Sequence, residues 1–463
     1  MANQSFDRRQ FLYSAAGTLS ANAAVEAASN RPPNVILIVC DDLGYGDTTP
    51  YGGPIPTPNL ARMAQEGVRC TNYVTAGPVC SASRAGYMTG RYGQRMGVLD
   101  VFFPHATSGM DLSETTMANM LKDRGYRTMC IGKWHLGDAP QYLPTNRGFD
   151  EYLGIPYSVD MHPRVMMQNT QVIEQEAPLD TLTERYTQRA VQFIEEAKSS
   201  PFFLYLPHSM PHIPQGASAR FRGKSEQGLY GDVVREIDWS VGEILAAVKK
   251  QGLDSNTLVM FSSDHGPWYQ GSPGRLRGRK GSTYEGGMRV AFYGRMPGRL
   301  PAGRVYDGLM SSMDIFPTVA KLCEAKLPEK KLDGVDAWPL LTGKTSKLER
   351  EGILYFMSKN LQCVRHERWK LRAANFNSPI YTPPPKDGRM NIALSHAELY
   401  DLETDQDESY DVAPEHPEIV NEMQARLERM MTDFPESIRQ AWDETKARHD
   451  AEQRAAAPPR LKS

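Results

Sequence analysis

Four short apolar runs along the chain end in ionisable residues. The run NVILIVC at 34–40 is rich in β-branched residues, too short for a typical helix, and followed by Asp41-Asp42. Such a run predicts a strand buried on both faces of a sheet. Runs of the same kind, each followed by Lys, His or Asp, lie at 128–131, 202–206 and 258–262.

Helical patterns separate these predicted strands, at 116–125, 186–198 and 232–252. Strands that alternate with helices predict an α/β fold, with a mostly parallel sheet between helices. In such sheets, ligands bind at the carboxyl ends of the strands. We therefore expect the four polar strand ends to meet in one crevice.

The pattern changes after a looser region at 344–350. Residues 353–358 and 362–372 are strand candidates, and 418–434 has the spacing of an amphipathic helix, which together predict a small α+β subdomain. The last residues are charged and rich in alanine, which favours a disordered tail. The predicted division is therefore an export signal at 1–30, a main α/β domain at 31–345, an α+β subdomain at 346–440 and a tail at 441–463.

The amino terminus has the features of a targeting segment. SFDRRQFL at 5–12 contains a twin arginine, an Ala-rich apolar stretch follows, and Ala21-Asn22-Ala23 offers a cleavage pattern of small residues. This arrangement resembles a twin-arginine export signal, so we expect a periplasmic or extracellular protein. The alternative is a short amphipathic helix with an incidental Arg-Arg pair.

Composition narrows the class of partner. The 463 residues carry 53 Lys and Arg against 55 Asp and Glu, a net charge of −2, so no general basic field is present to hold nucleic acid. No apolar run reaches the roughly 20 residues of a membrane span. Six cysteines are too few for a disulfide scaffold in a chain of this length. The sequence does not decide whether two of them form a single disulfide.

Two kinds of charge follow the predicted strands. Asp41, Asp42 and Asp264 would repel one another in one crevice unless a divalent cation lay between them. Alone, each is more typical of a turn or a helix cap than of a metal site, and only the set as a whole favours a cation. A dense set of donors suits a substrate oxyanion and comprises Arg84, Lys133, His135, His208, His212 and Lys280, with His208 more typical of a core residue.

The segment GPVCSASRAGYMTGR at 77–91 carries a family resemblance. Cys80-Ser81-Ala82-Ser83-Arg84 resembles the signature of the type I, formylglycine-dependent sulfatases, of the arylsulfatase and N-acetylgalactosamine-6-sulfatase kind, although Ala82 stands where the commonest signature has Pro. Further motifs follow in that family's order, and the resemblance extends from about Pro33 to Val412. These motifs are DDLGYGD at 41–47, GKWHLG at 132–137, PHIP at 211–214, SDHG at 263–266 and KGSTYEGGMR at 280–289.

The resemblance implies an alkaline-phosphatase-like fold and a specific chemistry. A maturation enzyme would oxidise Cys80 to formylglycine, whose hydrated form attacks the sulfur of a sulfate ester. Arg84 would lie beside this group and His135 would act as base. Lys133, His212 and Lys280 would bind the sulfate oxygens, with His212 or Lys280 protonating the leaving group. The implied ligands of one Ca²⁺ per chain are Asp41, Asp42, Cys80, Asp264 and His265, the last standing where the family often has Asn.

These observations together predict an exported, calcium-dependent sulfatase that acts on a small-molecule or oligosaccharide sulfate ester, with a sulfated carbohydrate as the expected substrate. Two alternatives stay open at this point. One is a phosphate or phosphonate monoester hydrolase on the same fold. The other is a non-catalytic protein that binds sulfated glycans, if Cys80 is not modified.

Overall fold

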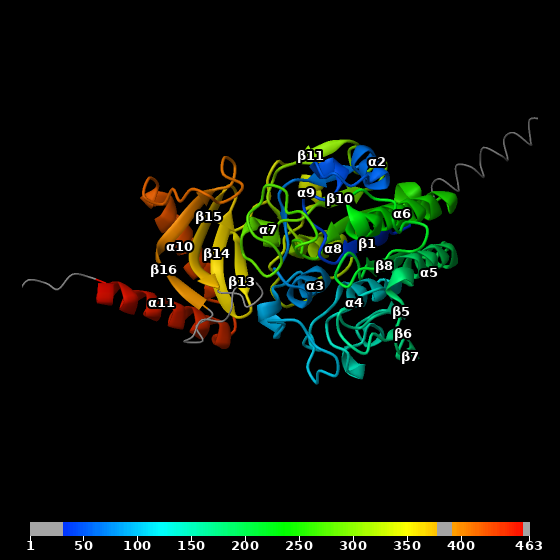
Figure 1. The fold of residues 1–463 in the computed structure, drawn as a ribbon, viewed down its shortest axis with the longest axis horizontal. Coiled ribbons are helices and arrows are strands. Elements are labelled where there is room, and N and C mark those ends of the chain that lie inside the picture. The colour runs from blue at the N-terminus through cyan, green and yellow to red at the C-terminus, as the bar shows by residue number, and fades with distance from the viewer. Residues whose placement is uncertain (1–30, 377–390, 457–463) are drawn as a thin grey trace, which may run out of the picture.

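A computed structural model describes residues 31–376 and 391–456. Two units lie side by side in Figure 1: a large one built on a ten-stranded sheet, and a smaller one built on a four-stranded sheet. Within the described ranges, no helix has the length and apolar character needed to cross a membrane. The export signal predicted for residues 1–30 lies outside the described residues.

The four strands predicted from apolar runs occupy the middle of the large sheet. Its order is β11-β2-β10-β9-β1-β8-β4-β5-β6-β7, and the five strands from β9 to β5 are parallel. The expected α/β class with a mostly parallel sheet is confirmed. The parallel strands are β1 (Asn34–Cys40), β4 (Arg127–Ile131), β5 (Glu151–Gly154), β8 (Phe202–Pro207) and β9 (Thr257–Ser263).

The sheet edges contain short strands that no apolar run predicted. On one side β10 is antiparallel to both β9 and β2, and on the other β6 and β7 form a hairpin beside β5. A separate pair, β3 and β12, is parallel. These strands are β2 (Val68–Cys70), β3 (Tyr73–Val74), β6 (Met166–Gln168), β7 (Gln171–Glu174), β10 (Phe292–Arg295), β11 (Arg304–Tyr306) and β12 (Met310–Ser311).

Helices cover both faces of the large sheet (Figure 1). Helices α2, α5 and α6 pack together on one face, and α3, α4 and α8 pack together on the other. The three helices predicted between the strands are present as α4, α5 and α6. The helices of this unit are α2 (Pro58–Glu66), α3 (Cys80–Thr89), α4 (Met117–Lys122), α5 (Leu182–Glu196), α6 (Gly228–Lys250), α7 (Glu285–Met288), α8 (Ile315–Leu322) and α9 (Trp338–Leu341).

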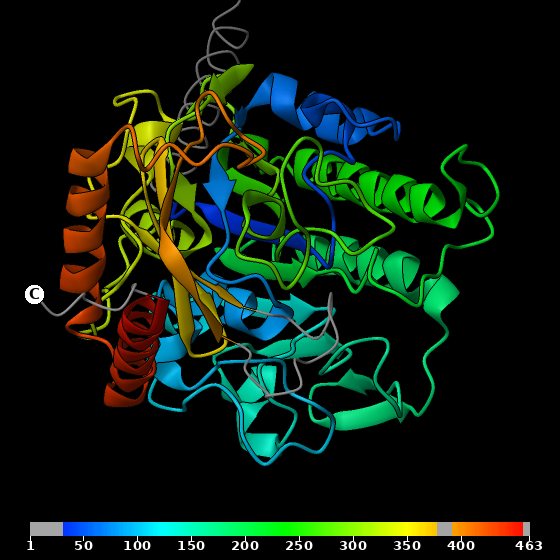
Figure 2. The same ribbon diagram turned by 60° about the vertical axis from the view of Figure 1, so that its left-hand side comes forward.

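The smaller unit is an antiparallel sheet in the order β13-β14-β15-β16, with α10 and α11 on its outer side (Figure 2). The strand candidate at 362–372 is two strands of a hairpin, because the chain reverses at Glu367, which has a φ of 50°. The elements are β13 (Ile353–Met357), β14 (Asn360–His366), β15 (Trp369–Phe376), β16 (Asn391–Asp401), α10 (Pro417–Met431) and α11 (Glu436–Ala456).

Residues 441–456 are helical and form the second part of α11, whereas the sequence predicted a disordered tail over 441–463. The helix continues to Ala456, while 457–463 lie outside the described residues. Ile438, Ala441 and Trp442 are buried, and α11 packs on β16 and β14. This spacing of three to four residues places the apolar side chains on one helical face, so packing stabilises a segment whose composition is mostly charged.

Candidate active site

The carboxyl ends of β1 and β9 bring the predicted carboxylates together. Cys40 and Ser263 are paired at the ends of these parallel strands, so the residues that follow them lie next to each other. The Asp264 amide donates to the Cys40 carbonyl at 3.0 Å, and the Asp42 amide lies 3.3 Å from Asp264 Oδ1. The sequence expectation that these strand ends meet in one site is confirmed in the fold.

A close approach of two strands sets the position of Lys133 and His135. Gly132 follows β4 with a φ of 127°, and a Cβ there would lie 1.9 Å from the Pro207 carbonyl oxygen at the end of β8. Only glycine fits at that contact. Asp42 and His135 also have left-handed backbones, with φ of 67° and 58°, a conformation that non-glycine residues hold only when their surroundings enforce it.

Cys80 is the first residue of α3 and lies in the middle of this charged cluster. Its side chain is 1% exposed, and Sγ is 3.2 Å from His265 Nε2, 3.4 Å from Lys133 Nζ and 3.6 Å from Asp41 Oδ1. No side chain caps the first turn of α3, whose free N–H groups favour an anion. Burial opposes a thiolate, but Lys133 and Lys280 outweigh it and lower the pKa of Cys80 to about 6.

The donor atoms have the chemistry of a cation site. Ligand atoms of Asp41, Cys80, Asp264 and His265 all lie within 4.8 Å of one another, and so do those of Asp41, Asp42, Cys80 and His212. These two overlapping groups contain all five predicted metal ligands and add His212. The structure therefore shows a buried carboxylate, cysteine and histidine cluster that fits a metal ion.

Two features indicate that the cluster is incomplete without a cation. Burial, with Asp41 and Cys80 nearby, raises the pKa of Asp264 to about 7 despite Arg84 and His265. The His265 ring faces the carboxylates through Nε2, 3.5 Å from Asp264 and 3.6 Å from Asp42, and its Nδ1–H donates to the Gly266 carbonyl at 2.9 Å. That hydrogen bond leaves Nε2 as the ring nitrogen that faces the cluster, as in metal-ligating histidines. Burial opposes a charged ring, but Asp264 and Cys80 raise the pKa of His265 to about 9, so a cation bound there would replace a proton.

Positive side chains surround the same cluster. Lys133 Nζ lies 2.6 Å from Asp41 Oδ2, and Lys280 Nζ lies 2.9 Å from Asp42 Oδ1. His212 Nε2 is 3.7 Å from Asp42, and its side chain is only 7% exposed. Burial disfavours the Lys280 ammonium, but Asp42 raises its pKa well above the usual value, so this group stays charged.

Arg84, His135 and His208 differ in what they contact. The Arg84 Nε and Nη2 groups donate to Asp264 Oδ2, at 3.1 and 2.9 Å, so the guanidinium orients this carboxylate. His135 Nε2 donates to a backbone carbonyl, its buried Nδ1 has no partner, and burial lowers its pKa well below the usual value. His208 lies 3.3 Å from Ser240 of α6, away from the cluster.

Sequence reasoning missed two polar residues at this site. Ser158 Oγ accepts from Lys133 Nζ at 3.1 Å, and Asp160 Oδ1 lies 3.9 Å from His212 Nδ1. Both belong to the loop after β5, whose backbone pairs with the segment after β4 through Trp134 N and the Ile155 carbonyl. The available signal was the short strand at 151–154, whose carboxyl end also faces the crevice.

Comparisons with known proteins agree with this geometry. The sulfatase family profile matches residues 33–325. The chain is 35% identical to arylsulfatase A of Bos taurus, over 92% of this chain and 94% of that protein. It is 37% identical to N-acetylgalactosamine-6-sulfatase of Canis lupus familiaris, over 76% of this chain and 74% of that protein.

Solved structures show the same fold. A sulfatase described with glycosaminoglycan metabolism in Bacteroides thetaiotaomicron superposes with a TM-score of 0.79 at 29% identity, over 87% of this chain and 99% of that chain. A protein solved in complex with a neocarrahexaose, Ps i-CgsB, gives a TM-score of 0.76 at 28% identity, over 88% of this chain and 94% of that chain. The matched profile, these relatives and the cysteine within a buried cation site together show that the chain belongs to the sulfatase family and is a sulfuric ester hydrolase.

Proposed function

We propose that this sulfatase removes sulfate from a monoester of a sulfated carbohydrate. Its nucleophile would be a formylglycine formed from Cys80, and one Ca²⁺ ion would be bound beside it. The observation that carries the proposal is the position of Cys80, between the carboxylates that would bind the cation and the ammonium groups that would bind sulfate. The glycosaminoglycan and carrageenan context of the two similar structures supports a carbohydrate substrate.

The proposed cation ligands are Asp41, Asp42, Asp264, His265 and the modified Cys80. The three buried carboxylates are hard oxygen donors of the kind that calcium prefers, and His265 adds one nitrogen. A cation held there supplies positive charge beside the reacting oxygen. Formylglycine supplies a hydrated aldehyde as nucleophile, which neither a thiol nor a serine hydroxyl provides.

The proposed substrate contacts come from Lys133, Lys280 and His212. Both ammonium groups are held by aspartates, so they are positioned before a sulfate arrives and stabilise the negative charge that develops during transfer. His212 and Lys280, which both lie beside Asp42, are the proposed proton donors to the leaving alcohol. Histidine commonly fills this role near neutral pH.

His135 is the proposed base. Its Nε2–H is occupied by the Phe102 carbonyl, at 3.0 Å, which leaves the unpaired Nδ1 as the proton acceptor. Burial and the nearby Lys133 and Arg84 lower the pKa of His135 well below its usual value, so the ring is neutral and Nδ1 carries a lone pair. Arg84 acts as a positioning residue that holds Asp264.

The decisive experiment is the mass of the tryptic peptide from Cys70 to Arg84, isolated from its native host or from cells that supply a maturation enzyme. The protein is denatured and alkylated before digestion. Cys70, a buried thiol in the same peptide, is the internal control and is expected to be alkylated. Cys80 is expected to lack sulfur, to carry an aldehyde oxygen and to escape alkylation.

Activity on nitrophenyl sulfate and nitrophenyl phosphate completes the test. We expect higher kcat/KM for the sulfate, since the site would be matched to an ester with one negative charge rather than nearly two. Preference for the phosphate would instead favour the monoester hydrolase alternative. Two alkylated cysteines in protein from the native host would overturn the formylglycine mechanism and favour a glycan-binding role.

A further inference from the structure

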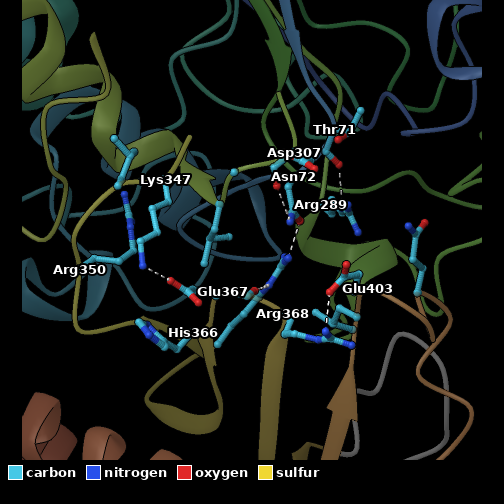
Figure 3. Close-up of a pocket in the computed structure, with 16 residues that line it drawn as sticks. Thr71, Asn72, Arg289, Asp307, Lys347, Arg350, His366, Glu367, Arg368 and Glu403 are labelled. Atoms are coloured by element: carbon cyan, nitrogen blue, oxygen red, sulfur yellow. Dashed lines mark hydrogen bonds and ion pairs between the residues drawn. The ribbon is translucent and has the colours of Figure 1, made fainter. Parts of the chain in front are cut away.

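A second polar cavity lies between the two units, apart from the catalytic cluster. Its volume is about 430 Å³, within the range of small-ligand pockets. Figure 3 shows that residues on the segment after β2, at the end of α7, in the connection between the units and on the β14–β15 hairpin surround it. The charged side chains that line it are Arg289, Asp307, Lys347, Arg350, Arg365, Glu367, Arg368 and Glu403, joined by His366.

The charge of this lining is unevenly distributed. At the rim, Lys347 pairs with Glu367 at 3.1 Å and Arg368 pairs with Glu403 at 2.7 Å. Lys347, Glu367 and Glu403 are more than half exposed, so water already solvates much of the rim. The inner lining is formed by three arginines: Arg350 and Arg365 are each paired with a buried carboxylate, and Arg289 is not.

Arg289 is the clearest case of an unmatched buried charge. It is 4% exposed, and its Nε donates to the Thr71 carbonyl at 2.7 Å, while Nη1 has no hydrogen-bond partner. It forms no ion pair with any carboxylate in the described part of the chain. Burial and the neighbouring Arg365 lower its pKa, against the attraction of Glu285, and its guanidinium lies 5.6 Å from the Tyr45 ring centroid. A guanidinium buried in this way is unfavourable unless a negative group approaches it.

Further donors face the same cavity from other segments. The Arg350 side chain is 6% exposed and binds Asp314 through Nη2 at 2.6 Å, but its buried Nε has no partner. His366 Nδ1 is also buried without a partner. Arg365, fully buried, lines the same wall, but its charge is already paired with Glu285 at 2.6 Å. The unmatched groups therefore come from both units of the fold.

We propose that this cavity is a second anion site, which binds an oxyanion between the large unit and the C-terminal sheet. The geometry fits a sulfate, phosphate or carboxylate group, because guanidinium N–H groups pair well with two oxygens of such anions. The occupant is either a free inorganic anion or the anionic group of a saccharide, and both present the same oxygens. The site is separate from the proposed catalytic contacts and does not depend on the formylglycine mechanism.

The test is a calorimetric titration with inorganic sulfate at low ionic strength, where screening is weak. The Lys280→Ala variant serves as background, since it weakens sulfate binding at the catalytic cluster. We expect sulfate binding to persist in this background. Adding Arg289→Gln should weaken the remaining affinity about tenfold or more, as expected for loss of a charge-assisted pair.

Two further variants keep the result interpretable. Lys347→Gln removes an exposed charge at the rim and should weaken binding about two- to threefold without disturbing buried contacts. Arg304→Gln, an exposed arginine on β11 that stacks on Tyr306, is the matched control and should leave affinity unchanged. If Arg289→Gln does not fold, Lys347→Gln decides the test.

A sulfated disaccharide, titrated in the same variants, separates the two sources of the anion. Tighter binding than sulfate with the same dependence on Arg289 assigns the site to a saccharide, and equal affinity assigns it to the free ion. The proposal is overturned if the Lys280→Ala protein binds no sulfate at millimolar concentration. It is equally overturned if neither Arg289→Gln nor Lys347→Gln changes the affinity.

Discussion

This protein contains two buried clusters of charged side chains, one at the interface between the two units and one at the catalytic site. They differ in the pKa of their carboxyl groups. In the interface cluster, Glu285 of α7 is held by Arg365 at 2.6 Å, by Tyr355 at 2.9 Å and by Lys370 at 3.1 Å. Burial opposes ionisation, but Arg365 and Lys370 lower the pKa of Glu285 to about 2. The catalytic cluster instead leaves Asp264 with a pKa raised to about 7.

This difference in pKa indicates a structural role for one cluster and a ligand-binding role for the other. The interface cluster satisfies its carboxylates with cations from the C-terminal sheet, so it binds two parts of the chain together. The catalytic cluster also pairs its three carboxylates with Arg84, Lys133 and Lys280, but burial beside Asp41 and Cys80 still raises the pKa of Asp264. A carboxylate that stays ionised is typical of a structural ion pair, and a perturbed carboxylate within a cluster of ligand atoms is typical of a ligand site.

The largest effect is expected from breaking the interface cluster. Lys370 contacts Glu285 and lies 2.8 Å from Glu408, with all three side chains fully buried. Lys370→Met would leave two buried carboxylates short of a cation and should lower the free energy of unfolding by about 3–5 kcal/mol. Urea unfolding measures this free energy. Lys347→Met removes an exposed ion pair and should change the free energy of unfolding by less than about 1 kcal/mol. Equal losses in the two variants would contradict the comparison of the clusters.

In the catalytic cluster, the corresponding change should reduce activity in addition to stability, because Lys133 and Asp41 are also a fully buried pair. Lys133→Met removes an ammonium that contacts Asp41, Cys80 and Ser158. We expect kcat/KM to fall about 10²–10³-fold, as for loss of one preorganised donor to a developing charge. Steady-state kinetics on nitrophenyl sulfate measures this. The control is Lys122→Met, on the surface of α4, which should leave kcat/KM unchanged. A similar fall in kcat/KM for this control would contradict the interpretation that Lys133 acts within the active site.

Removing the bound cation should have a smaller effect on thermal stability. This effect should depend on the catalytic cluster and not on the interface cluster. At a calcium concentration 100 times Kd, binding adds about 2.7 kcal/mol to the stability of the folded state. Calorimetric melting with and without EGTA should therefore show a lower Tm without calcium. Asp264→Asn should abolish most of this difference, whereas Glu285→Gln should retain it. A chelator effect that persists in Asp264→Asn would place the ion elsewhere.

Sequence patterns predicted the middle of the large sheet well because its strands are continuous apolar runs. The edge strands are two to four residues long and depend on pairing with distant segments, which no local pattern reveals. Helix α11 was missed for another reason: its charged composition concealed the apolar spacing of Ile438, Ala441 and Trp442.

For the site, strand ends predicted where Asp41, Lys133 and Asp264 would meet, and the family signature singled out Cys80. Ser158 was missed because it follows a strand of only four residues, β5, and no local motif marks it. The second cavity lay beyond sequence reasoning altogether. Arg289, Arg350 and Arg365 come from three separate segments, and only the packing of the two units brings them together.

The contacts of the C-terminal sheet with the segment that carries Lys280 also fix an order of events during synthesis. Lys370 Nζ donates to the Thr283 carbonyl at 2.9 Å, Arg372 donates to Thr283 Oγ1 at 3.1 Å, and the Glu285 amide donates to Glu408 at 2.6 Å. All of these partners emerge from the ribosome after the large sheet is complete. A nascent chain that ends at Leu341 thus already contains Lys280 and its large-unit contacts with Asp42 and Pro267, but the C-terminal anchors of the following segment form only when the last quarter of the protein has been made.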